Sequence, residues 1–312
     1  MASSHHFLQL SISLFFLSSL LIPSTALGTA RMTARMLYLV QQPATVLNYH
    51  NGPLLKGNLT VNIIWYGKFT TPQRAILIDF IQSVNLHMPA PSVSSWWSMT
   101  EKYKVGSTTL ILGKQTFDDK YSMGKSLQIN SLARMARRAD HVNAINVIFT
   151  AQDVSVYDFC MNLCGTHDSV RASKQSKTKF PYIWVGNPEL QCPGECAWPF
   201  AQPPYGPQTK PLVSPNGDVG IDGMIINLAT VLADAVTNPY DNGFYQGPAS
   251  APLEAVSACT GIYGKGAYPG YPGELLLDKT TGASYNAAGI HGRKYLLPAM
   301  WNPKTSACTT LV

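Results

Sequence analysis

The sequence predicts a mixed α/β fold, in which a βαβαβ sheet packs on a central buried helix and on a disulfide-braced, Pro/Gly-rich second half. Strand-like and helix-like segments alternate over residues 59–149. A nearly uncharged helical pattern covers residues 222–237, and cysteine, glycine and proline become frequent after Tyr157. The chain has 312 residues, of which 46% are hydrophobic, so it can bury a sizeable core. We therefore expect a single domain over residues 29–312.

The first strand and the first helix have clear signals. Residues 59–65 alternate between apolar and polar side chains, which is the pattern of a half-buried strand. Thr71 followed by Pro72 predicts a helix start with Thr71 as the N-cap, because threonine caps helices and proline fits their first turn. Four apolar residues at helical spacing predict the buried face of this helix: Leu77, Phe80, Ile81 and Val84.

The alternation continues further along the chain. Residues 108–112 and the largely apolar run 145–149 predict two more strands, and a helical stripe lies between them. That stripe consists of Leu132, Met135, Ala136 and Ala139. Strands that alternate with helices form parallel sheets covered on both faces, so we expect this arrangement.

The second half combines a loop with a buried helix. Residues 182–185 predict one more strand, but eight prolines between residues 186 and 218 exclude a continuous helix there. We expect an ordered loop, because aromatic rings such as that of Trp198 are costly to leave in water. Residues 222–237 are apolar on most sides, which predicts a buried helix whose one interior charge is Asp234.

The amino terminus is typical of a secretory signal peptide. Residues 7–22 are almost wholly apolar and are followed by small residues, so we expect a signal peptide over residues 1–28 that is cleaved near Ala26 or Gly28. The apolar run is shorter than the roughly 20 residues that span a bilayer. We expect a secreted, soluble protein of the extracellular space, with no membrane span after cleavage.

Six cysteines fit this oxidising location, where disulfides are favoured. They are Cys160, Cys164, Cys192, Cys196, Cys259 and Cys308. Three bridges among six cysteines allow 15 pairings, and the sequence does not select one. The two Cys-x-x-x-Cys pairs also permit a four-thiolate zinc site, although zinc knuckles favour the tighter Cys-x-x-Cys turn. In a secreted chain, Asn58 of the sequon Asn58-Leu59-Thr60 is the expected glycosylation site.

The charge is modestly positive. Lys and Arg number 23 and Asp and Glu number 17, which gives a net charge of +6. The longest basic stretches are Arg134, Arg137 and Arg138, and Lys174, Lys177 and Lys179. No aromatic residues interleave with them, so we do not expect nucleic-acid binding. A positive excess of this size favours a polyanionic neighbour, such as an acidic polysaccharide or a membrane surface.

Familiar catalytic motifs are absent from the sequence. There is no His-Glu-x-x-His pair, no Gly-x-Ser-x-Gly elbow and no phosphate-binding Gly-rich loop. His167 precedes Asp168 and could serve as a base or ligand, although such a histidine more often only forms a hydrogen bond in a loop. Asp234, in a buried helix, must be paired, protonated or metal-bound. We expect no catalytic residues, no metal and no cofactor.

Four segments resemble the plant Exordium family, also called the phosphate-induced protein family. These are residues 52–58 (GPLLKGN), 192–200 (CPGECAWPF), 247–249 (GPA) and 294–301 (KYLLPAMW). The resemblance covers essentially the whole mature chain. It implies a secreted protein of the apoplast or cell wall that is linked to brassinosteroid-responsive growth and cell expansion. No enzymatic activity is established for the family.

A more distant likeness concerns the buried helix. Residues 230–239 resemble the active-site helix of zinc peptidase-like bacterial relatives, which carry His-Glu-Leu-Ala-Glu there. Thr230 stands in place of the ligand histidine and Val231 in place of the catalytic glutamate, whereas Asp234 keeps an acidic group. The resemblance implies a zincin-like scaffold that has lost metal-assisted hydrolysis.

We expect a protein that binds rather than catalyses. Trp198 and Tyr205 are the candidates for stacking on sugar rings, and the positive charge favours an acidic wall polysaccharide, while an extracellular protein partner stays possible. The alternative is an unrecognised extracellular hydrolase on a degenerate metallopeptidase-like scaffold. That alternative requires His167 and Asp234 to meet in a shared cleft.

Overall fold

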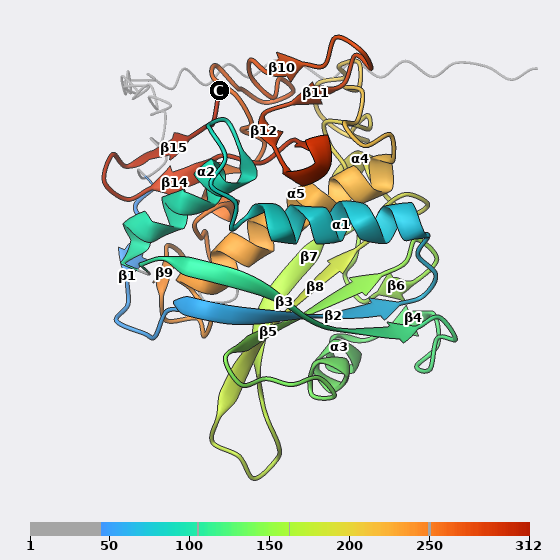
Figure 1. The fold of residues 1–312 in the computed structure, drawn as a ribbon, viewed down its shortest axis with the longest axis vertical. Helices are drawn as coiled ribbons and strands as arrows, with labels where there is room; N and C mark the ends of the chain where they lie inside the picture. Colours follow the sequence, from blue (N-terminus) through green and yellow to red (C-terminus); the bar gives the residue numbers. More distant parts are fainter. Residues whose placement is uncertain (1–44, 105, 162, 249–250) are drawn as a thin grey trace, which may run out of the picture. The chain divides into compact units, whose positions relative to one another are not determined.

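A five-stranded sheet in the order β3-β2-β5-β8-β7 forms the centre of the fold (Figure 1). The computed structural model describes residues 45–104, 106–161, 163–248 and 251–312, so the expected signal peptide lies outside the described residues. The strands are β2 (Gly57–Tyr66), β3 (Thr108–Asp118), β5 (Ala144–Thr150), β7 (Gly165–Arg171) and β8 (Lys179–Gly186). The first three and β8 run parallel, and β7 pairs antiparallel with β8 at the edge.

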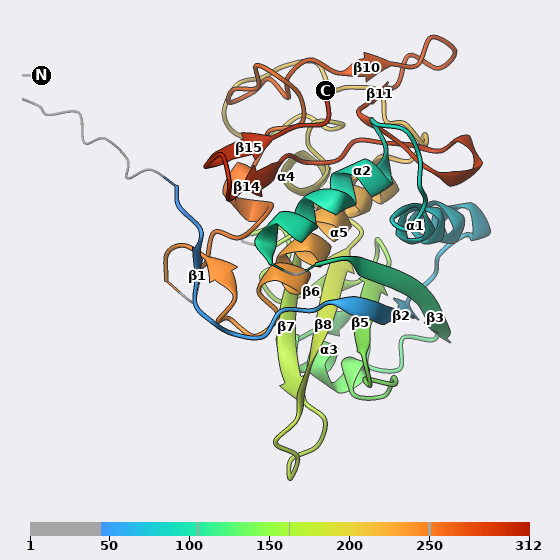
Figure 2. The same cartoon turned by 60° about the vertical axis from the view of Figure 1, so that its left-hand side comes forward.

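Helices cover both faces of this sheet, as the alternation of strands and helices predicts. Helix α1 (Thr71–Ser83) connects β2 to β3, and α3 (Ile129–Ala136) lies between β3 and β5 in the chain. Figures 1 and 2 show α1 and α5 on one face and α3 on the other. The mixed α/β fold is confirmed, and each predicted strand lies inside or overlaps an observed one.

The half-buried character predicted for residues 59–65 is wrong for most of this run, because β2 is a central strand in which Asn62 and Ile64 are buried as well, whereas Thr60 is partly buried. Asn62 is 3% exposed. Its amide donates to Oδ1 of Asn146 at 3.0 Å and to the carbonyl of Asp140 at 2.9 Å, and its Oδ1 accepts from the amide of Lys114. These bonds satisfy the side chain where the pairing of β2 with β3 shifts register.

Helix α1 begins one residue earlier than its sequence predicts. Thr70, not Thr71, is the N-cap, and it forms a capping box with Gln73. The amide of Gln73 donates to Thr70 Oγ1 at 3.3 Å, and Gln73 Oε1 accepts from the amide of Thr70 at 3.0 Å. The expected apolar face is confirmed, because Leu77, Phe80, Ile81 and Val84 are all buried.

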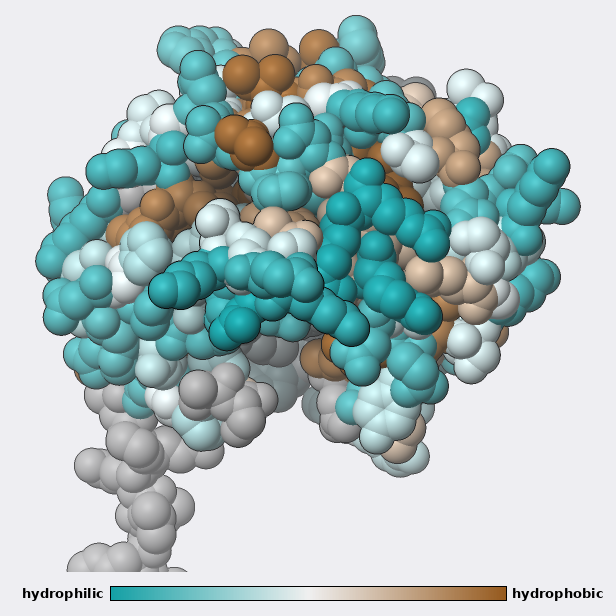
Figure 3. Space-filling view, turned by 90° about the horizontal axis from the view of Figure 1, so that it is seen from below, coloured by the Kyte–Doolittle hydropathy of each residue, from teal (hydrophilic) through white to brown (hydrophobic). Residues whose placement is uncertain are grey.

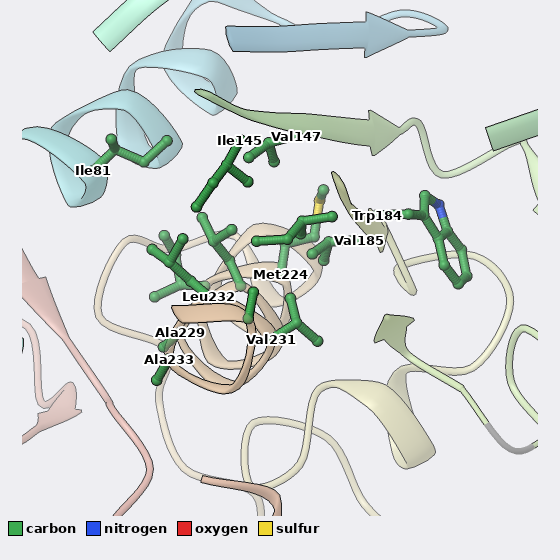
Figure 4. Close-up of a cluster of buried hydrophobic side chains, with 14 of the residues drawn as sticks. Ile81, Ile145, Val147, Trp184, Val185, Met224, Ala229, Val231, Leu232 and Ala233 are labelled. Atoms are coloured by element: carbon green, nitrogen blue, oxygen red, sulfur yellow. The ribbon is translucent and has the colours of Figure 1, made fainter. Parts of the chain in front are cut away.

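Helix α5 (Val219–Thr237) is the predicted buried helix, and it packs against β7 and β8. Asp218 caps its first turn by accepting from the amide of Ile221 at 2.9 Å. Figure 4 shows Met224 and Leu232 of α5 in one apolar cluster with Ile145 of β5 and Val185 of β8. By length and composition α5 could cross a membrane, but 83% of its most apolar window is buried inside the protein, as in a core helix.

The remaining elements are short. The helices are α2 (Val93–Trp97), α4 (Pro193–Cys196), η1 (Ser98–Tyr103), η2 (Ser257–Cys259) and η3 (Ile290–Gly292). Antiparallel pairs join β1 (Asn48–Tyr49) with β9 (Phe244–Tyr245), β10 (Leu276–Leu277) with β11 (Ser284–Tyr285), β12 (Ala287–Ala288) with β13 (Lys294–Tyr295), and β14 (Met300–Asn302) with β15 (Ala307–Thr309). A parallel pair joins β4 (Ser126–Leu127) with β6 (Ser155–Val156). Residues 187–218, between β8 and α5, form the expected loop, interrupted only by α4.

All six cysteines form disulfides, which confirms the bridge interpretation and leaves no thiolate for zinc. The pairs are Cys160–Cys192, Cys164–Cys196 and Cys259–Cys308. In the first two bridges, each cysteine of the first Cys-x-x-x-Cys motif bonds to one cysteine of the second motif. These bridges therefore connect the segment before β7 to both ends of α4. The third ties η2 to β15.

Candidate functional site: an aromatic pocket and a buried carboxylate cluster

An open pocket of about 620 Å³ lies beside α4, between residues 194–207 and residues 260–270. Trp198, Tyr205 and Tyr268 contribute its aromatic rings, and four prolines line much of the rest. The structure thus brings Trp198 and Tyr205, both singled out from the sequence, into one site. It adds Tyr268, which the sequence analysis missed because its segment lies more than sixty residues further along the chain.

Local contacts hold this pocket in shape. The bridges at Cys192 and Cys196 anchor α4, and the amide of Leu212 closes the following loop by donating to the carbonyl of Pro199 at 2.9 Å. Gly270 packs against Pro207 and so connects the two segments that line the pocket. Glycine is required there, because φ is +88° and a Cβ would stand 2.5 Å from Pro207. The pocket is therefore formed before any ligand arrives.

The three rings differ in exposure. Trp198 is half-buried, with its ring tilted against buried Tyr263 at 5.7 Å between centroids. Tyr268 is 64% exposed and leans on Tyr271 at 5.1 Å. Tyr205 is 86% exposed, contrary to the expectation that the aromatic rings of this loop would be withdrawn from water. The exposed rings beside an apolar pocket make this surface a candidate for binding.

The pocket carries little charge. Among the described residues that line it, Glu195 is the only charged one, and Thr260 adds a hydroxyl. The lining therefore suits a ligand with apolar faces and hydroxyl groups better than an anion.

A second cluster, of ionisable side chains, lies where β7, the end of α5 and the segment before η2 meet. His167 Nε2 lies 3.1 and 3.0 Å from the two carboxylate oxygens of Glu254. Asn238 Nδ2 donates to Glu254 Oε1 at 2.6 Å. Asp234 accepts from the amides of Val256 at 2.7 Å and Ser257 at 3.3 Å. These bonds tie three segments that are distant in sequence.

Burial and mutual charge perturb this cluster. Burial alone would lower the pKa of His167, but the adjacent Glu254 carboxylate outweighs it, so the pKa is raised. Burial, reinforced by the charge of Glu254, raises the pKa of Asp234 to about 7. Among the residues that the structure describes, His167 Nδ1 has no hydrogen-bond partner.

The side chains of this cluster are largely buried. His167 and Asp234 do belong to one group, linked through Glu254, which the sequence analysis missed because no motif surrounds it. However, the side chains of His167 and Glu254 are 9% and 7% exposed, and Asp234 is 2% exposed. Within the described residues, no group of three or more His, Cys, Asp and Glu side chains could hold a metal ion.

Thr230 and Val231, which align with the ligand histidine and the catalytic glutamate of the zinc peptidase-like relatives, have ordinary structural roles. Thr230 Oγ1 donates to the carbonyl of Ile226, one turn back in α5, at 2.9 Å. Val231 lies in the buried apolar cluster (Figure 4). Nothing in the described residues favours a zincin-like scaffold in particular. Asn58 is exposed near the start of β2, and its glycosylation stays a prediction.

The fold and sites define a disulfide-bonded α/β protein with an open aromatic pocket and a sealed acidic cluster. The chain belongs to the Exordium family: the model of the "Phosphate-induced protein 1 conserved region" matches residues 47–311. It is 55% identical to Protein EXORDIUM-like 2 of Arabidopsis thaliana and 54% identical to Protein PHOSPHATE-INDUCED 1 of Nicotiana tabacum, with 100% of each chain covered. It is also 55% identical to Protein EXORDIUM of Arabidopsis thaliana, over 86% of this chain and 90% of that one. No solved structure matches. The family resemblance expected from the sequence is confirmed.

Proposed function

We propose that this chain is a secreted, non-catalytic protein of the plant apoplast or cell wall that binds wall carbohydrate, in support of brassinosteroid-responsive growth and cell expansion. Membership of the Exordium family supports the link to plant growth. Three disulfides suit an oxidising compartment outside the cell. The observation that carries the binding function is the aromatic pocket.

The chemistry of sugar rings fits this pocket. One face of a pyranose presents C–H bonds, which carry a small positive charge and pack on the negative face of an aromatic ring. Trp198, Tyr205 and Tyr268 offer three such rings around a volume of about 620 Å³. Tyrosine and tryptophan also bring a large contact area at a low cost in conformational entropy.

The charge of the pocket narrows the class of sugar. Glu195 would repel a carboxylated sugar, and the lining holds no Lys or Arg. We therefore expect neutral wall oligosaccharides, built from glucose or xylose units, rather than acidic ones. A hydroxyl from such a ligand has Glu195 and Thr260 as hydrogen-bond partners.

The absence of catalysis is part of the proposal. The sealed His167–Glu254 pair supports it, because a general base must come within hydrogen-bond reach of its substrate. Both side chains are more than nine-tenths buried. None of His167, Asp234 and Glu254 is among the described residues that line the aromatic pocket.

Isothermal titration with cello-oligosaccharides and xyloglucan oligosaccharides tests this function. The variant Tyr205→Ala/Tyr268→Ala removes two exposed rings, and each is worth about 1 to 2 kcal/mol at a binding hot spot, so affinity should fall by at least about tenfold. Tyr157→Ala is the matched control, because Tyr157 is 58% exposed and lies outside the pocket. Saturable binding that survives the double variant, or no binding by the wild type, would refute the proposal.

A further inference from the structure

Two basic stretches that are separate in sequence form one surface. The last residues of α3 and the turn after it carry Arg134, Arg137 and Arg138, and the β7–β8 hairpin carries Arg171, Lys174, Lys177 and Lys179, all of them exposed. Arg137 Nε donates to the carbonyl of Arg171 at 3.0 Å, so the two stretches are in contact. We call these seven residues, with exposed Lys56, the basic face. Figure 3 views the molecule from this side and shows mostly hydrophilic side chains.

The charge of the basic face is not neutralised by ion pairs. In the described part of the chain, none of its eight cations lies within ion-pair distance of a carboxylate. The acidic residues nearby are exposed Asp140, Asp168 and Asp241. Eight positive charges against three negative ones leave an excess that attracts anions over several ångströms.

A cleft of about 580 Å³ opens on the basic face, at the edge of the sheet where the parallel strands begin. Its lining includes Lys56, His141 and Lys179, together with the hydroxyls of Ser176 and Thr178. The His141 ring stacks on buried Phe180, with centroids 4.6 Å apart, so it is held as a flat platform. Cations, hydroxyls and a ring face together suit a sugar that carries a carboxylate.

We propose that the basic face and its cleft bind an acidic polysaccharide, a chain of carboxylated sugars such as polygalacturonate. The cleft takes one sugar unit, and the cations of the hairpin contact carboxylates further along the chain. This inference deepens the proposed function by naming a second class of wall carbohydrate and a separate site for it. Helix α3 and the β7–β8 hairpin, which carry most of the basic face, lie at the end of the molecule away from α4 (Figures 1 and 2), and the aromatic pocket lies beside α4.

The composition of the hairpin favours a polysaccharide over a membrane. Residues 171–179 read RASKQSKTK, so hydroxyl and amide side chains separate the cations. A membrane-binding segment also needs large apolar side chains that enter the bilayer, and this stretch has none. Val142, 71% exposed at the cleft, is one apolar side chain and is not enough for such an anchor.

Charge reversal on the hairpin tests the proposal with the full mature chain. Lys174→Glu/Lys177→Glu should lower the affinity for polygalacturonate by at least about tenfold, because two attractions become repulsions. Lys279→Glu/Lys304→Glu is the matched control, since it makes the same change in net charge at exposed positions outside the basic face. Its effect should stay below about threefold. Lys56→Gln/Lys179→Gln tests the cleft separately and should also weaken binding.

The outcomes separate this inference from the proposed function. Binding of polygalacturonate should weaken steeply with added salt and should be lost when the carboxylates are methyl-esterified. Tyr205→Ala/Tyr268→Ala should leave it intact, just as Lys174→Glu/Lys177→Glu should leave xyloglucan binding intact. Equal losses in the hairpin variant and its control, an affinity equal for the esterified polymer, or binding only to phosphatidylserine vesicles would each overturn the inference.

Discussion

Raising the pH from 5 to 8 should destabilise this protein, because two buried carboxyls hold protons in the folded state that they lose on unfolding. Burial raises the pKa of Asp222 to about 7 despite its hydrogen bonds with Asn216. Burial and the charge of Glu254 raise the pKa of Asp234 to about 7. Both start from an ordinary value of 3.8. A raised pKa stabilises the fold below the unfolded value, and this contribution disappears as the pH rises through the folded value.

The size of the effect follows from these shifts. Each carboxyl adds at most about 1.4 kcal/mol per pH unit to the fall in the free energy of unfolding, between roughly pH 4 and pH 7. For two carboxyls we expect a loss of about 3 to 5 kcal/mol between pH 5 and pH 7. His167, whose pKa is also raised, acts in the same direction above pH 6.5, the ordinary value for histidine. The loss is large beside a typical total stability of about 5 to 15 kcal/mol.

Urea denaturation at half-unit steps of pH measures this dependence. Asp234→Asn and Asp222→Asn each remove one titrating group, so each should reduce the slope between pH 5 and pH 7 by about half. Asp119→Asn, which removes an exposed carboxyl, should leave the slope unchanged. The reasoning fails if the wild-type protein is equally stable at pH 5 and pH 7, or if it becomes more stable as the pH rises.

Three further variants test the supports of the two sites. Cys164→Ser/Cys196→Ser opens a loop of 32 residues and should cost about 3 to 4 kcal/mol of stability, measured by thermal unfolding under oxidising conditions. Glu254→Ala leaves the donors of two buried side chains without a partner and should cost about 3 to 5 kcal/mol, with Glu254→Gln less harmful because one acceptor remains. Gly270→Ala, at a φ of +88° in the pocket wall, should weaken binding of xyloglucan oligosaccharides but not of polygalacturonate.

The central parallel strands β2, β5 and β8 were predictable because most of their residues are buried and apolar. Strand β7, with the sequence GTHDSVR, has no such signal. It forms because β8 offers it an open edge for antiparallel pairing. The burial of Asn62 could not be predicted from local sequence either, because its partners Asn146 and Asp140 lie about eighty residues away in the chain.

The sequence identifies candidate site residues by their chemistry, but it does not show which of them lie together in the fold. Trp198 and Tyr205 stand out as aromatic residues in a proline-rich loop, whereas Tyr268 joins them only through the fold. Similarly, His167 and Asp234 are unusual in sequence, but their link is Glu254, which no local pattern marks. Spacing along the chain does not encode such contacts when they depend on disulfides and on helix packing.

The two proposed carbohydrate sites belong to one disulfide-bonded unit, so they can act together. A chain that holds a neutral polymer at the aromatic pocket and an acidic polymer at the basic face would bridge the two. Its release would then require the loss of both contacts, because the remaining contact keeps the other site at a high effective concentration. At low salt, washing with buffer should therefore extract Lys174→Glu/Lys177→Glu no more easily than the wild type from pure xyloglucan, but far more easily from a mixed xyloglucan and polygalacturonate gel. Equal extraction of the two proteins from the mixed gel would mean that the sites act independently.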